Sequence, residues 1–127
     1  MKLNHVTLVV TNLEGSKAFY RALGLVQIVD TPPCYARFVC PDGDATLSIE
    51  VTGEKPVPSA QLYFECDTLD ATVDVLKSRG LQFVQDPTDM FYLWREARLR
   101  DPDGHGVRLY FAGDNRLHPP ALSAERT

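Results

Sequence analysis

The alternation of apolar and polar residues predicts two similar successions of strands and one helix. Apolar residues recur at every second position in 3–10 and 61–66. In the segment after each of these, which ends near Leu23 in the first half and at Gly80 in the second, they recur at every third or fourth position. The first period is typical of a strand with one buried face, and the second of an amphipathic helix. Further strands are expected at 25–29, 35–40, 46–51, 81–84, 93–100 and 107–111. Each half therefore reads strand, helix, strand, strand, strand.

The two halves also align with each other residue by residue. His5–Asp30 can be laid over Gln61–Asp86 without a gap, so that the first strand, the helix and the glycine after it coincide. Two copies are too few for a solenoid, which needs about three repeats to bury a core. We therefore expect one domain over 1–127, made of module one (3–51), a linker (52–58), module two (60–111) and a tail (112–127).

Several local signals mark where these elements begin and end. Thr11 and Glu14 have the spacing of a capping box, and Gly24 can take the left-handed conformation that ends a helix. Residues 86–91 are expected to form a loop. The tail loses periodicity from Ala112 on, so we expect it to lie on the surface with a frayed end.

Composition narrows the class of partner. The chain has 127 residues, 44% of them hydrophobic and 24% charged, and a net charge of -4. A negative net charge argues against nucleic-acid binding, and no apolar run reaches membrane length. The three cysteines have no disulfide or zinc spacing, and the N-terminus has no signal-peptide pattern. We therefore expect a cytoplasmic protein that binds neither nucleic acid nor a membrane.

The same alternation divides each sheet into two faces. One face is apolar and is expected to pack against the helix. The other carries aromatic residues interleaved with charges, which favours the wall of a ligand cleft over a solvated surface. We expect this polar face to hold His5, Thr7, Tyr35, Arg37, Ser48, Glu50, Gln61, Tyr63, Glu65, Trp94, Glu96, Arg98, Arg100, Arg108 and Tyr110.

The order and spacing of four segments resemble the vicinal oxygen chelate superfamily, which includes glyoxalase I, extradiol dioxygenases, and fosfomycin- and bleomycin-resistance proteins. The segments are HVTLVV, LSIEV, QLYFEC and REARLRDPDGHGVRLYF, and the similarity extends over residues 3–111. The resemblance implies an α+β fold, in which two βαβββ modules form a curved mixed sheet around a cleft with the helices on the outer face. It also makes a homodimer the expected assembly.

The resemblance further implies a divalent metal, held by one residue from the first strand and one from the fourth strand of each module. Those positions fall on His5, Glu50, Gln61 and Arg108, with Ser48 as the alternative to Glu50 if the turn is counted differently. A guanidinium cannot donate a lone pair to a cation. We therefore expect either no cofactor or a weakly held metal ion on His5, Glu50 and Gln61.

Two functions follow from this degraded metal site. The first is a protein that binds a small anionic or aromatic compound through Arg37, Tyr63, Trp94, Arg98 and Arg108, since arginine binds carboxylates and stacks on rings. The alternative is a metal-dependent lyase, isomerase or dioxygenase, or a metal-free enzyme, with His5 and Glu50 as catalytic groups.

Simpler roles are open for the same charged residues. Glu50 is expected to pair with Arg108, and Glu65 and Glu96 can form a charge network with the arginines of the polar face. His105 and His118 are expected to be exposed.

Overall fold

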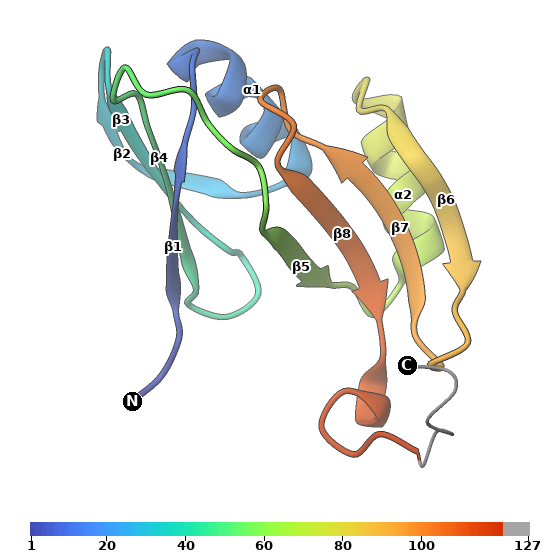
Figure 1. Cartoon of the computed structure of the whole chain (residues 1–127). Helices are drawn as coiled ribbons and strands as arrows, with labels where there is room; N and C mark the ends of the chain where they lie inside the picture. The colour runs from blue at the N-terminus through green and yellow to red at the C-terminus, as the bar shows by residue number, and fades with distance from the viewer. Residues whose placement is uncertain (121–127) are drawn as a thin grey trace. The chain divides into compact units, whose positions relative to one another are not determined.

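The computed structural model describes residues 1–120, and the first half of the chain forms a four-stranded sheet with one helix (Figure 1). Its elements are β1 (His5–Val9), α1 (Leu13–Leu23), β2 (Val26–Thr31), β3 (Tyr35–Val39) and β4 (Thr46–Glu50). The strand order is β1-β4-β3-β2, with β1 parallel to β4 and the other pairs antiparallel.

The second half repeats this arrangement. Its elements are β5 (Gln61–Glu65), α2 (Leu69–Ser78), β6 (Phe83–Asp89), β7 (Arg95–Arg100), β8 (Gly106–Phe111) and a short 3₁₀ helix, η1 (Gly113–Asn115). The strand order is β5-β8-β7-β6, again with one parallel pair, β5 and β8. Both sheets are mixed and open, so the predicted pair of βαβββ modules is confirmed.

The chain divides into two compact units. One unit comprises Met1–Ala60 together with Asp101–His105, and the other begins at Gln61 and omits those five residues. The turn between β7 and β8 therefore packs with the first module, although it belongs to the second in sequence.

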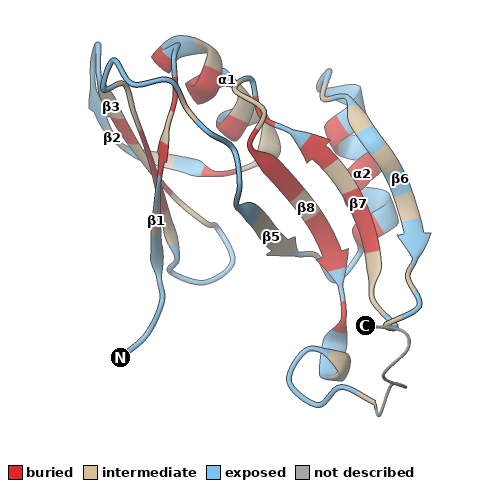
Figure 2. Ribbon diagram, in the orientation of Figure 1, coloured by how far each residue is buried: buried red, intermediate tan, exposed pale blue. Residues whose placement is uncertain are grey.

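Each helix covers the apolar face of its own sheet, where the core lies (Figure 2). In the first unit, Tyr20 of α1, Phe38 of β3 and Ile49 of β4 are fully buried. In the second unit, the fully buried residues include Val73 of α2, Leu99 of β7 and Val107 of β8. The alternation in sequence predicted this face in both sheets, because residues two apart on a strand point the same way.

The turn Asp101–His105 is anchored by a buried carboxylate. Asp101 is 4% exposed and accepts hydrogen bonds from the Tyr20 hydroxyl at 2.8 Å and from the backbone N–H groups of Asp103 at 3.0 Å and His105 at 2.8 Å. The expected exposure of His105 is wrong. This side chain is buried, with its Nε2 at 2.8 Å from the Val9 carbonyl oxygen.

The same turn changes how α1 begins. The Thr11 hydroxyl and backbone N–H bind the Asp103 carboxylate, at 2.7 Å and 3.2 Å. The N-cap is instead Asn12, whose side chain accepts a hydrogen bond from the Gly15 N–H at 3.1 Å. The predicted capping box with Thr11 is therefore wrong, because a contact distant in sequence takes the hydroxyl. The predicted left-handed end at Gly24 is confirmed, with φ of 113°.

Strand β6 is longer than its sequence predicted. It continues to Asp89, so most of the loop expected at 86–91 is strand. The strand lies at the sheet edge, next to β7 alone, and its register shifts twice. An edge strand tolerates Pro87 because the N–H that proline lacks needs no partner on the open side.

The start of the tail is held in place by Glu65. One oxygen of this carboxylate accepts hydrogen bonds from the backbone N–H groups of Ala112 at 3.0 Å and Gly113 at 3.1 Å. The frayed end predicted for the tail concerns residues 121–127, which lie outside the described residues. Over the described residues, no helix combines the length and hydrophobicity that crossing a bilayer requires.

Candidate functional site

The strand registers show which residues of the two modules occupy equivalent positions. In module one, His5 lies opposite Thr46 and Thr7 opposite Ser48. In module two, Gln61 lies opposite Gly106 and Tyr63 opposite Arg108. Since Gln61 is the counterpart of His5 in the repeat, the counterpart of Arg108 is Ser48. Of the two alternatives that the sequence left open for this position, the register favours Ser48 over Glu50.

The next strand extends the correspondence. Arg37 on β3 lies opposite Ser48, and Arg98 on β7 lies opposite Arg108. The two arginines are therefore equivalent, as their similar sequence contexts indicated. Two residues earlier on the same strands, Tyr35 of module one corresponds to Glu96 of module two.

In module one these positions form a hydrogen-bonded chain that ends on one guanidinium. His5 Nε2 lies 3.2 Å from the Ser48 hydroxyl, and that hydroxyl lies 2.6 Å from the Tyr35 hydroxyl. Arg37 Nε donates to the Tyr35 oxygen at 2.9 Å. The other nitrogen of His5, Nδ1, lies 2.6 Å from the Thr46 hydroxyl. We call His5, Ser48, Tyr35 and Arg37 the module-one chain.

In module two the equivalent positions form a charged cluster around one buried carboxylate. Glu96 is 1% exposed, and its oxygens contact the Tyr92 hydroxyl at 2.5 Å, Arg98 at 3.3 Å and Arg108 at 3.8 Å. Arg108 also donates to the Tyr63 hydroxyl at 2.7 Å. One carboxylate thus faces two guanidiniums, which leaves one positive charge in excess.

The two guanidiniums retain unused donors. Among the described residues, the Nε atoms of Arg98 and Arg108 are buried and have no hydrogen-bond partner. Most buried polar groups in proteins are paired, and leaving one unpaired costs about 1–3 kcal/mol. Excess positive charge and unpaired donors together make this cluster suited to an anion.

Aromatic rings adjoin the charged cluster. Trp94 stacks on Tyr110 with ring centroids 4.7 Å apart and an interplanar angle of 20°. Tyr63 meets both rings edge to face, at 6.1 Å and 5.6 Å, and the Arg108 guanidinium lies 5.4 Å from the centre of the Tyr63 ring. Such a surface can take a flat ring beside a carboxylate. We call these three rings, with Glu96, Arg98 and Arg108, the module-two cluster.

The bond from Tyr92 to Glu96 should be visible in a titration. Burial, followed by the hydrogen bond to Glu96 and the charge of that carboxylate, raises the pKa of Tyr92 to about 12. We expect Glu96→Gln to bring this pKa back toward the usual value of about 10, because the neutral amide disfavours the phenolate less. Tyrosine ring-carbon NMR from pH 8 to 13, with Tyr92→Phe to assign the signal, measures it. A pKa that is the same in wild type and Glu96→Gln would contradict this expectation.

The donor set implied by the resemblance does not fit a divalent metal ion. Among residues 1–120, His, Cys, Asp and Glu side chains nowhere gather in a group of three or more that could hold a metal. At the equivalent positions the modules offer one imidazole, a hydroxyl, an amide and a guanidinium. The Gln61 amide lies over Gly106, where a Cβ would be only 2.0 Å from its Oε1.

Glu50 lies opposite Tyr35 but at the far end of the strand pair from His5. It ends β4 opposite Val9, whereas His5 begins β1, so the parallel register separates them by four residues. That is roughly 13 Å along the strands, too far for one ion between side chains that stand upright on the sheet. The roles predicted for Glu50, as a catalytic group, a metal ligand or a partner of Arg108, are untested and stay predictions.

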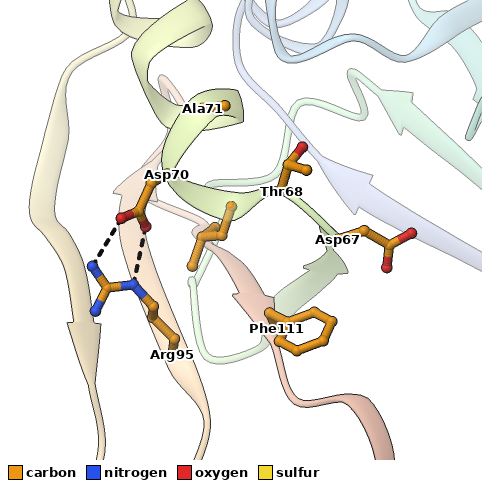
Figure 3. Close-up of a pocket in the computed structure, with 7 residues that line it drawn as sticks. Asp67, Thr68, Asp70, Ala71, Arg95 and Phe111 are labelled. Carbon is orange, nitrogen blue, oxygen red and sulfur yellow. Dashed lines mark hydrogen bonds and ion pairs between the residues drawn. The ribbon is translucent and has the colours of Figure 1, made fainter.

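A shallow hollow lies elsewhere, at the start of α2 (Figure 3). Its volume is about 370 Å³, and its lining comprises Asp67, Thr68, Leu69, Asp70, Ala71, Arg95 and Phe111. Figure 3 shows Arg95 turned toward Asp70, which it contacts through two bonds of 3.0 Å, and Arg95 also binds Asp89. None of the site residues predicted from sequence lines this hollow.

The structure adds Tyr92 to the residues predicted from sequence. Tyr35 and Glu96 were expected on the polar face, and Ser48 was expected there as the alternative to Glu50. Tyr92 was not considered, because it follows the segment expected to be a loop. Period-two alternation alone could have paired Tyr35 with Ser48, but the Tyr92–Glu96 contact depends on the conformation of the turn between β6 and β7.

Comparison with known proteins bears out the resemblance seen in the sequence. Residues 2–109 match the family model of the Glyoxalase/Bleomycin resistance protein/Dioxygenase superfamily. A comparison with curated proteins gave no match.

Several solved structures share the fold. A glyoxalase/bleomycin resistance protein/dioxygenase family enzyme from Burkholderia phytofirmans PsJN is 20% identical, with a TM-score of 0.73 over 88% of this chain and 99% of that one. A superfamily member from Sphaerobacter thermophilus is 21% identical, with a TM-score of 0.72 over 87% and 97%. A glyoxalase/bleomycin resistance protein/dioxygenase from Nocardioides is 20% identical, with a TM-score of 0.74 over 98% and 90%. The chain therefore belongs to the Glyoxalase/Bleomycin resistance protein/Dioxygenase superfamily.

Proposed function

We propose that this chain is a small-molecule-binding member of the superfamily, and that its ligand is an aromatic carboxylate held by the module-two cluster. The observation that carries the proposal is the imbalance around Glu96, where two guanidiniums with unpaired buried Nε atoms face one carboxylate. An excess positive charge on two half-buried arginines favours a negatively charged partner, and arginine binds carboxylates through two parallel hydrogen bonds.

The adjoining rings favour an aromatic ligand over a small anion such as acetate. Trp94 and Tyr110 already stack on each other, and Tyr63 is 44% exposed beside them. A ligand ring can therefore cover Tyr63 while its carboxylate meets Arg108, which donates to the Tyr63 hydroxyl. Affinity should depend on ring and charge together.

Calorimetric titration with four probes tests the proposal: 1-naphthoate, benzoate, benzyl alcohol and acetate. We expect 1-naphthoate to bind most tightly, benzoate more weakly, and benzyl alcohol and acetate at least tenfold more weakly than benzoate. Arg108→Gln should weaken naphthoate binding about 10- to 100-fold, the range for losing a hydrogen bond to a charged group.

The matched control is Arg21→Gln, which removes an exposed arginine from α1 of the other module. Its naphthoate affinity should equal that of the wild type. The proposal fails if benzyl alcohol binds as well as benzoate, or if Arg108→Gln and Arg21→Gln bind naphthoate alike.

We further propose that the protein forms a homodimer and is located in the cytoplasm, as the sequence and the family resemblance indicate. Neither is needed for the module-two cluster, whose residues all come from one compact unit.

A further inference from the structure

The turn between β6 and β7 holds a leucine in a backbone conformation that favours glycine. The Met90 N–H donates to the Trp94 carbonyl oxygen at 2.8 Å, and the Leu93 N–H donates to the Met90 carbonyl oxygen at 3.0 Å, which closes a three-residue loop, 91–93. The last residue of such a loop is often left-handed. Here it is Leu93, with φ of 67°, and no other residue of 1–120 except glycines has a positive φ. A bulky side chain is strained in this conformation, so the turn depends on contacts from outside it.

Residues 112–116, which follow β8 and which we call the strap, supply such contacts. The Asn115 side-chain amide donates to the Leu93 carbonyl oxygen at 3.3 Å. The Asn115 backbone carbonyl oxygen accepts a hydrogen bond from Trp94 Nε1 at 3.5 Å. One residue of the strap therefore binds both the left-handed leucine and the indole that follows it.

The Glu65 carboxylate fixes the position of the strap at both ends. One of its oxygens accepts hydrogen bonds from the backbone N–H groups of Ala112 and Gly113, at 3.0 Å and 3.1 Å. Its other oxygen lies 3.9 Å from Arg116 Nε. Because the strap begins and ends at one carboxylate, Asn115 is held in place between these contacts. All of these residues belong to the same compact unit as the module-two cluster.

Trp94 is the ring that a larger ligand would contact next to Tyr63. Tyr63 is 44% exposed, and both Trp94 and Tyr110 adjoin it edge to face. Of these two neighbours Tyr110 is buried, whereas Trp94 is half-buried and keeps some free surface. One ligand ring can be covered by Tyr63 alone, but a two-ring ligand extends beyond a single phenol ring. The position of Trp94 therefore decides how well the second ring is held.

We propose that Asn115 is a positioning residue for the aromatic side of the ligand site, and that the strap thereby sets the ring size that the module-two cluster prefers. Asn115 holds the turn at Leu93 and the indole of Trp94, which keeps Trp94 stacked on Tyr110. It acts through Trp94 and does not itself contact the ligand. This inference rests on the proposed function, the binding of an aromatic carboxylate, and adds the group that selects among such ligands.

Calorimetric titration of Asn115→Ala and Asn115→Asp with 1-naphthoate and benzoate tests the inference. The aspartate keeps the shape of the side chain but has no N–H to donate to Leu93. In both variants we expect the affinity for naphthoate to fall about 3- to 10-fold, within the range for one aromatic pair, while the affinity for benzoate stays at the wild-type value. A merely structural role of Asn115 would weaken both probes by the same factor.

Tryptophan fluorescence provides a second measurement that needs no ligand. Trp94 is the single tryptophan of the chain, so the whole signal reports on its surroundings. In Asn115→Ala and Asn115→Asp the indole should be less restrained against Tyr110. We therefore expect acrylamide to quench the fluorescence of both variants more strongly than that of the wild type, and the emission maximum to move to longer wavelengths.

The matched control is Asn4→Ala, which removes an exposed asparagine side chain from module one and should equal the wild type in both measurements. If the wild type binds both probes, two outcomes overturn the inference and leave the proposed function standing: an equal loss of naphthoate and benzoate affinity in Asn115→Ala, or unchanged quenching of Trp94. If neither probe binds to the wild type, the proposed function fails and this inference fails with it.

Discussion

Replacing Glu96 by alanine should lower the free energy of unfolding by about 3–5 kcal/mol, the usual result of removing one partner from a buried ion pair. Glu96 is 1% exposed and is the only carboxylate that contacts both Arg98 and Arg108 among the described residues. Its loss leaves two guanidiniums without a counter-charge and the Tyr92 hydroxyl without its 2.5 Å acceptor. Urea unfolding followed by circular dichroism measures the change.

Two further variants separate charge from shape. Glu96→Gln keeps an acceptor for Tyr92 but removes the negative charge, so we expect a loss between those of wild type and Glu96→Ala. Glu14→Ala is a matched control, since this glutamate is exposed and pairs with Lys17 on α1, and its loss should stay below about 1 kcal/mol. Losses that are equal in Glu96→Ala and Glu14→Ala would show that the cluster does not depend on Glu96.

The same variant should bind anions more tightly if it folds. With Glu96 gone, two guanidiniums face the ligand without an internal carboxylate competing for them. Benzoate should therefore raise the melting temperature of Glu96→Ala more than that of wild type, whereas benzyl alcohol should not distinguish them. This outcome would connect the stability of the cluster to its proposed ligand.

Much of the fold follows from the sequence, because the information is local and occurs twice. Alternation at 3–10 and 61–66 predicted which side chains share a face of each sheet. Because the two halves repeat, the elements predicted for one half also had to fit the sequence of the other. The expected match of Arg37 with Arg98 is confirmed by the strand registers. Element ends were less accurate, as β6 shows, because an edge strand can continue through a proline.

Contacts distant in sequence were not predictable in this way. Nothing near Asp101 indicates that its carboxylate is buried under Tyr20, or that His105 reaches the Val9 carbonyl oxygen. An Asp-Pro-Asp-Gly segment is typical of an exposed turn. Asp101 is buried because that turn packs with module one. The spacing of apolar residues along the chain does not predict this packing.

The two modules have diverged at equivalent positions while keeping one backbone. Module one places a histidine, a serine, a tyrosine and an arginine where module two places a glutamine, an arginine, a glutamate and an arginine. The first set is a hydrogen-bonded chain that ends on one guanidinium, and the second is a charged cluster around one buried carboxylate. The two modules therefore share one arrangement of the backbone, and they differ at these positions in the chemistry of their side chains.

Replacing Asp101 by alanine should lower the free energy of unfolding by about 2–4 kcal/mol. The Tyr20 hydroxyl is buried beneath this carboxylate, and the N–H groups of Asp103 and His105 also depend on it. Each buried group left without a partner costs about 1–3 kcal/mol. Asp103→Ala, in the same turn but less buried, is the matched control and should cost about 1 kcal/mol.

A double-mutant cycle determines how much of this loss belongs to the tyrosine–carboxylate bond. Tyr20→Phe alone removes the donor together with its need for a partner, so we expect a loss of about 1–2 kcal/mol. Once the hydroxyl is gone, Asp101→Ala leaves one fewer buried group unpaired, so the losses should fall short of additivity by at least about 1 kcal/mol. Urea unfolding of the four proteins gives this coupling. Additive losses would mean that Asp101 acts through the backbone of its own turn, and that Tyr20 stabilises α1 by packing alone.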